Sequence, residues 1–148
     1  MNNVVLLVTG DRNWSNGARI YRTIAAAAPF LSRVIHGGAR GADTLAGDVA
    51  VKLGIPVTRY PAQWDRWGRS AGMIRNQQML TVGRPNLVFA FHNDIRKSRG
   101  TADMIGRAGK ERLMVVLFTA ETGEVVHRPP GIVQPNVLLT VLNQLGME

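Results

Sequence analysis

The residues between positions 36 and 43 carry the clearest chemical signal in the sequence. Three glycines, Gly37, Gly38 and Gly41, separate an apolar run from a helical pattern. A residue without a Cβ lets backbone N–H groups approach an anion closely, and the N-terminus of the following helix adds a partial positive charge. The spacing therefore predicts a phosphate-binding turn. It is neither the fingerprint G-x-G-x-x-G nor a P-loop, so the ligand of neither motif follows.

Two polar residues flank this turn, and each has two interpretations. Asp43, near the start of the helix, either interacts favourably with the helix dipole as a capping residue or holds a ribose hydroxyl. His36, at the end of the apolar run, either makes a structural hydrogen bond or acts as a base at the ligand. Both are kept as candidate ligand-binding residues.

A second candidate region covers residues 61–76, where aromatic and basic residues alternate with glycine. Trp64 and Trp67 are suited to stacking on a planar ring, and Arg69 and Arg75 to neutralising phosphate. The two tryptophans have an alternative role, which is to anchor the segment to the core. Asn76 lies next to Arg75 and joins the candidate ligand contacts.

Two further loops follow apolar runs. Gly10 and Arg12 come after the first run, where glycine permits close backbone approach and arginine adds a fixed charge. A structural turn explains Gly10 equally well. Arg99, Gly100 and Thr101 precede a later helical pattern, so their N–H groups and the threonine hydroxyl are suited to binding phosphate.

The net charge is +8, from 18 basic and 10 acidic residues, and 15 of the basic residues are arginine. Arginine grips phosphate with a planar fork, but a preference for arginine over lysine also follows from the base composition of a genome. Residues 59–112 hold eleven basic and four acidic groups. A positive field of this kind attracts anions from a free nucleotide to a DNA strand, so it indicates a class of partner only.

Composition excludes several classes of protein. At 148 residues and 45% hydrophobic content, the chain is expected to form one domain and is not intrinsically disordered. Without cysteine there is no disulfide framework and no thiol nucleophile. The three histidines lack metal-ligand spacing, so we expect no metal and no cofactor. The longest apolar runs are far shorter than a membrane span and the N-terminus lacks a basic signal region, so we expect a cytoplasmic protein without a membrane partner.

The elements that must position these residues follow from hydrophobic periodicity. Apolar runs at residues 4–8, 34–35, 55–60, 87–91 and 113–118 alternate with helical patterns, which predicts an α/β fold with a Rossmann-like open parallel sheet of about five strands and helices on both faces. Ligands of such sheets bind outside the carboxyl ends of the strands. Residues 61–70 read as the one long loop of the body.

The remaining segments complete a single domain over residues 1–148, with a core at about 4–118 and a C-terminal extension at 119–148. The helix expected over residues 70–82 is polar, and it faces either a ligand, a partner subunit or solvent. The residues left for it to bury are Met73, Ile74, Met79 and Leu80. Residues 125–127 indicate a short strand or an extended piece, and an amphipathic pattern over 135–146 indicates a closing helix.

Three ordered motifs together carry a family resemblance. They are His36-Gly-Gly-Ala-Arg-Gly-Ala-Asp43, Trp64 through Gly68-Arg69-Ser-Ala-Gly72 to Arg75-Asn76, and Arg99-Gly-Thr-Ala-Asp103. Over residues 4–118 the chain resembles the YspA/YpsA-related branch of the SLOG superfamily. The resemblance implies a Rossmann-like domain that binds nucleotides or nucleotide-derived ligands. Relatives include the LOG phosphoribohydrolases and the DNA-binding DprA proteins.

The resemblance to LOG enzymes also implies candidate catalytic residues. These enzymes cleave the N-glycosidic bond of nucleoside monophosphates with an arginine on a helix and acids after a P-G-G-x-G-T motif. Arg75 matches the arginine, Gly100 and Thr101 match the G-T, and Asp103 matches the first acid. The P-G-G is missing, and Met104 stands at the second acid, which removes a carboxylate from the reaction.

We therefore expect a protein that binds or senses a phosphorylated nucleotide derivative, such as a nucleoside phosphate or an ADP-ribose-like molecule, and self-associates as a homo-oligomer. Weak N-glycosidic hydrolysis is a secondary expectation. The alternative is a DprA-like nucleic-acid-binding protein. The candidate catalytic residues are Arg75 and Asp103, and the candidate ligand contacts are Gly10, Arg12, His36, Gly37, Gly38, Gly41, Asp43, Trp64, Arg69, Asn76, Arg99, Gly100 and Thr101.

Overall fold

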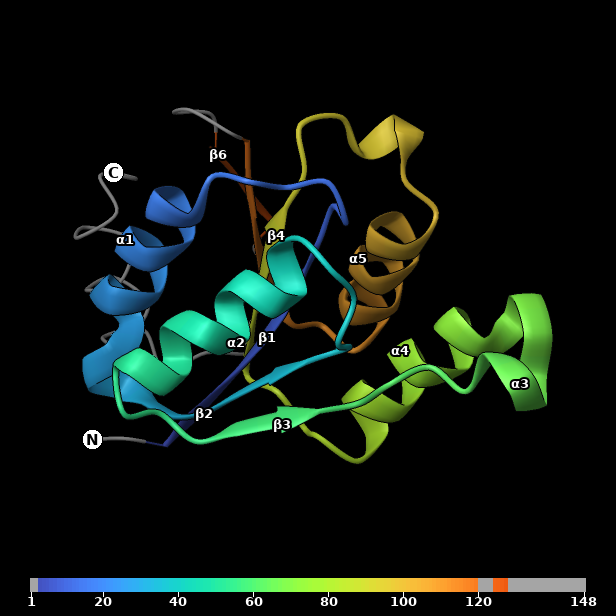
Figure 1. Ribbon diagram of the computed structural model, residues 1–148, viewed down its shortest axis with the longest axis horizontal. Helices are drawn as coiled ribbons and strands as arrows, with labels where there is room; N and C mark the ends of the chain where they lie inside the picture. Colours follow the sequence, from blue (N-terminus) through green and yellow to red (C-terminus); the bar gives the residue numbers. More distant parts are fainter. Residues whose placement is uncertain (1–2, 120–123, 128–148) are drawn as a thin grey trace.

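The computed structural model describes residues 3–119 and 124–127. Its sheet has six strands in the order β3-β2-β1-β4-β5-β6, and the first five of that order are parallel (Figure 1). β6 pairs antiparallel with β5 at one edge. The strands are β1 Val4–Gly10, β2 Leu31–His36, β3 Val57–Arg59, β4 Leu87–Phe91, β5 Met114–Phe118 and β6 Glu124–His127.

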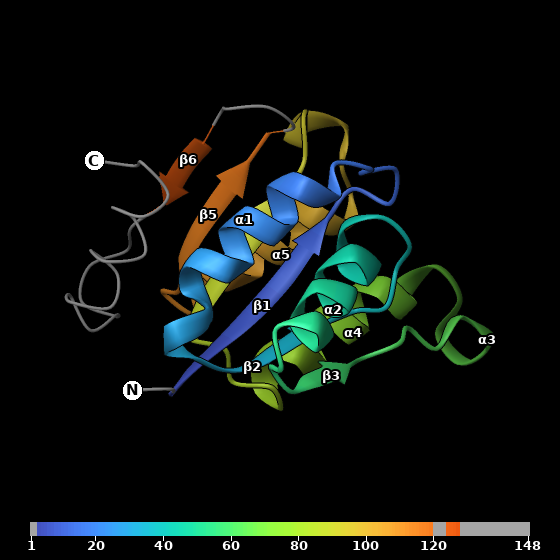
Figure 2. The ribbon, with the colours of Figure 1, turned by 60° about the vertical axis from the view of Figure 1, so that its left-hand side comes forward.

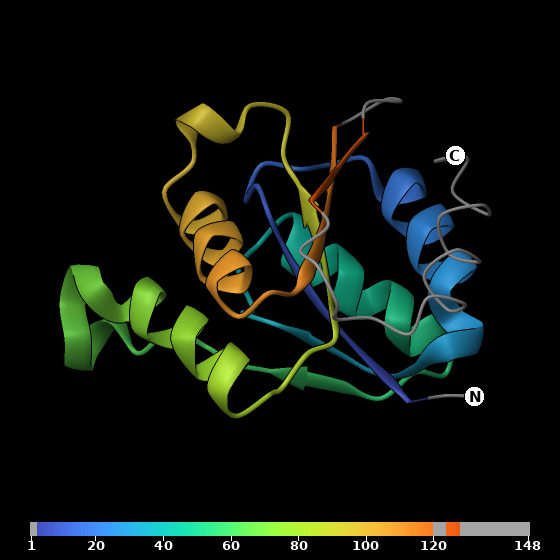
Figure 3. The ribbon, with the colours of Figure 1, turned by 180° about the vertical axis from the view of Figure 1, so that it is seen from behind.

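Helices cover both faces of this sheet. Helices α1 and α2 lie on one face, and α4 and α5 lie on the other (Figure 2). The short helix α3 stands out beyond the end of the sheet, next to the start of α4 (Figure 3). The helices are α1 Gly17–Ala27, α2 Ala42–Lys52, α3 Trp64–Trp67, α4 Ala71–Thr81 and α5 Gly100–Lys110, with 3-10 turns η1 Ala28–Phe30, η2 Gly68–Ser70 and η3 Ile95–Lys97.

The strands β4 and β5 are apolar throughout because both of their faces are buried. In β4, Phe89 and Phe91 pack into the core on the α1 and α2 side, and Val88 and Ala90 pack on the α4 and α5 side. Every residue of β4 is buried. This arrangement explains why the strand reads as a continuous apolar run and not as an alternating one.

The predicted α/β fold with its five-stranded parallel sheet is confirmed. β2 begins at Leu31, earlier than the expected start at residue 34. The apolar pattern missed the first half of this strand because Ser32 and Arg33 are polar. The segment 61–70 was expected to be a loop, but it contains α3 and η2. The short strand expected at 125–127 lies within β6. The closing helix expected over 135–146 lies outside the described residues.

The helix expected over residues 70–82 is α4, but its buried residues differ from the expectation. Met79 and Leu80 are buried as predicted, whereas Met73 and Ile74 are largely exposed. Asn76 is buried instead. A polar side chain therefore occupies the interior position of this helix, and its partners lie at the candidate site.

The strand order reverses direction at the junction between β1 and β4. The connection after β1 runs to α1 on one face, and the connection after β4 runs to α5 on the other. Carboxyl ends of strands at such a switch point leave room for a ligand. Within residues 3–119 and 124–127, no helix is both long and apolar enough to cross a membrane.

Candidate functional site

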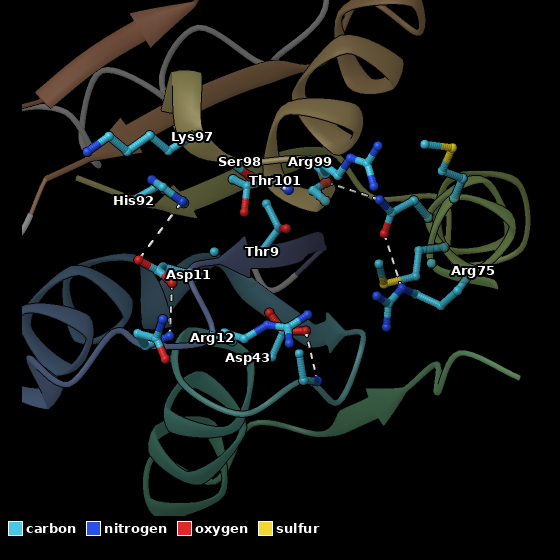
Figure 4. Close-up of a pocket in the computed structure, with 18 of the residues that line it drawn as sticks. Thr9, Asp11, Arg12, Asp43, Arg75, His92, Lys97, Ser98, Arg99 and Thr101 are labelled. Atoms are coloured by element: carbon cyan, nitrogen blue, oxygen red, sulfur yellow. Dashed lines mark hydrogen bonds and ion pairs between the residues drawn. The ribbon is translucent and has the colours of Figure 1, made fainter. Parts of the chain in front are cut away.

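A cavity of about 620 Å³ lies at the carboxyl ends of β1 and β4 (Figure 4). One wall comes from the residues that end β1 and follow it, and another from the N-terminus of α5. Helices α3 and α4 supply the remaining side. Five basic side chains line the cavity, namely Arg12, Arg69, Arg75, Lys97 and Arg99, against two carboxylates, Asp11 and Asp43. The site is therefore electropositive.

Most of this positive charge is available to a ligand. Within the described part of the chain, the side chains of Arg12, Arg69, Lys97 and Arg99 make no hydrogen bond or ion pair. Arg12 and Arg99 are exposed to solvent. Unpaired guanidinium groups around a concave site are suited to gripping the oxygens of a phosphate or carboxylate.

The N-terminus of α5 is held in place beside these cations. Ser98 Oγ accepts hydrogen bonds from the N–H groups of Thr101, at 2.9 Å, and Ala102, at 3.3 Å. Asn76 Nδ2 donates to the carbonyl of Gly100 at 3.2 Å. Ser98 thus caps the helix, and the buried Asn76 fixes its first turn against α4.

The glycine-rich turn after β2 binds an internal group. The N–H groups of Gly37 and Ala39 donate to Asp43 Oδ2, at 3.0 and 3.3 Å. The N–H of Gly38 donates to His36 Nδ1 at 2.9 Å. The donors that the sequence assigned to a phosphate therefore point at the carboxylate and imidazole of the chain itself, because the first turn of α2 brings Asp43 back under the loop.

Burial raises the pKa of Asp43 to about 6. The positive charge of Arg75 and the N–H groups of Ala39 and Gly37 act in the opposite direction. Burial also lowers the pKa of His36, and the charge of Arg59 adds to this effect. The imidazole next to this turn is therefore held in its neutral form, which agrees with the structural interpretation of His36.

Two glycines let this turn pack against the segment after β1. Gly41 has a φ of +78°, and a Cβ there would meet the carbonyl oxygens of Asp11 and Arg12. At Gly10 a Cβ would meet the carbonyl of Phe91 and the side chain of Ala42. Close backbone packing therefore accounts for both glycines, as the structural interpretation of Gly10 anticipated.

Arg75 lines the cavity while it also supports the turn after β2. Its Nη1 donates to the carbonyl of Gly37 at 2.6 Å, and its Nε donates to Asn76 Oδ1 at 3.1 Å. Burial lowers the pKa of Arg75, and the nearby Asp43 carboxylate opposes this. The guanidinium is fixed before any ligand arrives.

Asp103 does not line the cavity. Its Oδ2 accepts hydrogen bonds from Asn76 Nδ2 at 3.0 Å and from Arg107 Nε at 2.8 Å. Met104 is fully buried in the core between α4, α5 and the sheet. The residue that follows Asp103 therefore points into the interior, and the Asp103 carboxylate links α4 to α5.

The two tryptophans of α3 occupy different surroundings. Trp64 lines the cavity with 56% of its surface exposed. Trp67 is 44% exposed, and the Arg66 guanidinium lies 4.7 Å from its ring centre. Neither side chain is buried, so neither anchors the segment to the core.

The structure brings ten of the candidate residues together around the cavity: Gly10, Arg12, Asp43, Trp64, Arg69, Arg75, Asn76, Arg99, Gly100 and Thr101. Five others do not line it: His36, Gly37, Gly38, Gly41 and Asp103. The prediction did not include several lining residues, among them Thr9, Asp11, His92, Lys97 and Ser98. The signal that could have found Asp11 and His92 is their position shortly after two buried apolar runs, at the ends of β1 and β4.

Comparisons with known proteins agree with this geometry at the level of family and fold. A family model described as the YspA, cpYpsA-related SLOG family matches residues 4–67. The Gene 61 protein of Mycobacterium phage D29 is 32% identical over 121 residues, which cover 76% of this chain and 94% of the phage protein.

Among solved structures, DNA processing protein A (DprA) from Streptococcus pneumoniae is similar, with a TM-score of 0.61 and 18% sequence identity. The similarity covers 97% of this chain and 54% of DprA, so the chain spans about half the length of that protein. At this identity the likeness concerns the fold alone.

Proposed function

This chain belongs to the YspA, cpYpsA-related SLOG family, and from that premise we propose that it binds a phosphorylated nucleotide derivative in the cavity at the carboxyl ends of β1 and β4. Nucleoside phosphates and ADP-ribose-like molecules are the ligands of this class that we consider. The observation that carries the proposal is the excess of basic side chains in the cavity, five against two carboxylates.

The cavity offers separate environments to the parts of such a ligand. At the N-terminus of α5 the helix dipole and the guanidinium of Arg99 favour phosphate. The N–H groups of Thr101 and Ala102 are engaged by Ser98 Oγ. Arg12 and Arg69 add charge from two other sides. The exposed face of Trp64 suits a planar base. A volume of about 620 Å³ lies within the range of small-molecule sites.

Binding is better supported than hydrolysis. A glycosidase needs a carboxylate in reach of the reacting bond, and Asp103 is engaged with Asn76 and Arg107 outside the cavity lining. Arg75 remains in the cavity wall, where we assign it to positioning phosphate. We therefore give the two candidate catalytic residues different roles, Arg75 in ligand binding and Asp103 in holding α4 to α5.

The proposal is tested by mass spectrometry and calorimetry. Protein purified without added nucleotide is denatured, and any released molecule is identified by its mass. Binding of nucleoside phosphates is then measured by isothermal titration calorimetry. Replacing Arg99 by alanine should weaken binding by about 1.5–3 kcal/mol, as expected for a hydrogen bond to a charged group.

The matched control is Arg22→Ala, since Arg22 is an exposed arginine of α1 that does not line the cavity. It removes the same charge and should leave the affinity unchanged. Equal losses in the two variants would assign the effect to net charge. Wild-type protein that binds none of the phosphates would contradict the proposal.

Nucleic-acid binding is the second candidate. It is favoured by the fold similarity to DNA processing protein A and by Trp64, Arg66 and Arg69, which expose aromatic and basic side chains on α3 and η2. Aromatic faces and guanidinium groups are the features on which single strands stack. The two candidates differ in their response to salt.

We further propose that the chain self-associates through α3 and α4. Trp67 and Ile74 are 44% and 40% exposed and line a second, smaller hollow. Light scattering at micromolar concentration should give a mass above that of the monomer. Ile74→Glu should lower that mass, whereas Val51→Glu, which places the same charge on an exposed apolar position of α2, should not.

A further inference from the structure

Asp11 and His92 are the first residues after the two strands that meet at the switch point. Gly10 of β1 and Phe91 of β4 are in register, and the N–H of Asp11 donates to the carbonyl of Phe91 at 2.9 Å. The N–H of His92 donates to Phe118 of β5 at 3.0 Å. The sheet itself therefore sets the backbone positions of both residues, with no ligand needed.

The orientation of the His92 ring is fixed as well. Nδ1 accepts a hydrogen bond from the N–H of Asp94 at 3.0 Å. A ring nitrogen that accepts from an N–H carries no proton, so the hydrogen of the neutral ring is on Nε2. Figure 4 shows that the ring points toward Asp11, with the Nε2 to Oδ2 contact drawn as a dashed line. His92 thus presents one N–H donor at the cavity.

Asp11 presents one free acceptor to the same space. Its Oδ1 accepts from the N–H of Asn13 at 2.9 Å, which restrains the position of this oxygen. Oδ2 lies 3.9 Å from His92 Nε2, a separation too long for a direct hydrogen bond. Among the described residues, neither Oδ2 nor Nε2 has a hydrogen-bond partner.

The separation matches a hydroxyl group. An oxygen at about 2.8 Å from both atoms fits between Nε2 and Oδ2, accepting from the imidazole and donating to the carboxylate. A hydroxyl does both at once, whereas an ionised phosphate oxygen only accepts and a methylene does neither. The negative charge of Asp11 also keeps phosphate away and directs it toward Arg99 at the other wall.

We propose that Asp11 and His92 form a subsite that reads a free hydroxyl on the sugar of the bound phosphate ester, so that the protein selects ribose-type ligands over deoxyribose-type ligands. The inference rests on the proposed function, because it specifies the sugar of the same ligand. The sequence analysis considered Asp43 as the residue that holds a ribose hydroxyl. We assign this role to Asp11 instead, because Asp43 Oδ2 accepts hydrogen bonds from Gly37 and Ala39.

The experiment compares adenosine 5′-monophosphate with its 2′-deoxy and 3′-deoxy forms by isothermal titration calorimetry. Wild-type protein should bind the fully hydroxylated ester at least about tenfold more tightly than one deoxy form, the factor for losing one hydrogen bond to a charged group. Asp11→Asn replaces one of the two carboxylate oxygens, Oδ1 or Oδ2, with an NH2 group and removes the negative charge. The ratio of the affinities for the hydroxylated and deoxy esters should then fall toward one. Removing a carboxylate also raises the affinity for any phosphate. This general effect is the same for all three esters, so it cancels in the ratio.

Asp65→Asn is the matched control, since Asp65 is an exposed carboxylate of α3 outside the cavity lining, and it should keep the full preference. Equal affinity of wild-type protein for all three esters would overturn the subsite while leaving the proposed function in place. A preference that persists in folded Asp11→Asn would also overturn it. If none of the three esters binds, the subsite is overturned for nucleoside monophosphates. If ADP-ribose, titrated in the same way, also fails to bind, the proposed function is overturned as well.

Discussion

Asp43 places a carboxylate in a buried position, which links its protonation to the stability of the fold. Its pKa is raised to about 6 in the native protein, from an ordinary value of 3.8. Between these two values the native state holds a proton that the unfolded chain has released. The free energy of unfolding should therefore fall as the pH rises from about 4 to about 6, and this contribution should be constant above that window.

The measurement is urea unfolding of wild-type protein and of Asp43→Asn across pH 4 to 7. The asparagine oxygen still accepts from the turn but does not titrate. The difference in unfolding free energy, wild type minus variant, should decrease through the window and then level off. A difference that increases with pH would mean that Arg75 and the N–H donors of the turn outweigh the cost of burial.

Asp103 joins two helices, and its substitution tests whether this role is structural. Asp103→Asn removes the charge that pairs with Arg107 and turns one acceptor into a donor facing Asn76 or Arg107. We expect a loss of about 1–3 kcal/mol in the free energy of unfolding, measured by urea denaturation, with Asp65→Asn as the exposed control. Unchanged stability together with loss of a slow base-releasing activity would instead make Asp103 a catalytic residue.

These roles explain which parts of the site the sequence could predict. The positions of Arg12, Arg99 and Thr101 follow from strand ends and helix starts, which local patterns reveal. The internal partners of Asp43 and Asp103 do not, because they depend on how α2 folds back under its own loop and how α4 packs on α5. A glycine-rich turn also looks the same in sequence whether its N–H groups bind a ligand or a carboxylate of the chain.

At the level of elements, the turn between β2 and α2 depends on one backbone conformation. Gly41→Ala forces a Cβ against the carbonyl oxygens of Asp11 and Arg12 at a positive φ, so we expect destabilisation by about 1 kcal/mol or more. The control is Gly106→Ala in α5, where a Cβ meets nothing within 4 Å. That change should stabilise the helix by about 0.5–1 kcal/mol.

Thermal unfolding of the two variants should therefore give shifts of opposite sign. Equal shifts would mean that the turn adapts and that its glycine is not required. Nucleotide binding by the Gly41 variant should also weaken, because a Cβ at position 41 presses on the backbone of Asp11 and Arg12, whose residues line the cavity.

Helices and strands could be located from the sequence where all of their residues are buried to the same degree. β4 and β5 were located closely because every residue in them is buried. α3 was missed because four residues are too few to show a helical period. Met73 and Ile74 were expected in the interior, but they are exposed. Hydrophobicity alone does not reveal that α3 and the start of α4 project from the sheet (Figure 1).

Five of the 18 basic residues of the molecule line one concave site, and this arrangement favours a small anion over a polymer. Arg12, Arg69 and Arg99 converge on one cavity from three different elements. A small phosphate ester needs only a few cations that face one cavity. A nucleic-acid strand requires charges in a line along its backbone, and the cavity-lining cations of the described residues have no such order.

Single-stranded DNA should therefore bind weakly and in a strongly salt-dependent manner. If about three phosphates are neutralised, the logarithm of the association constant should fall with the logarithm of the salt concentration at a slope of about −2. Fluorescence anisotropy of a labelled oligothymidine between 50 and 200 mM salt measures this slope. Adenosine 5′-monophosphate should displace the strand, because both bind to the same basic side chains. A strand that stays tightly bound at physiological salt and is not displaced by the nucleotide would need contacts outside the cavity. Nucleic-acid binding would then replace small-ligand binding as the leading function.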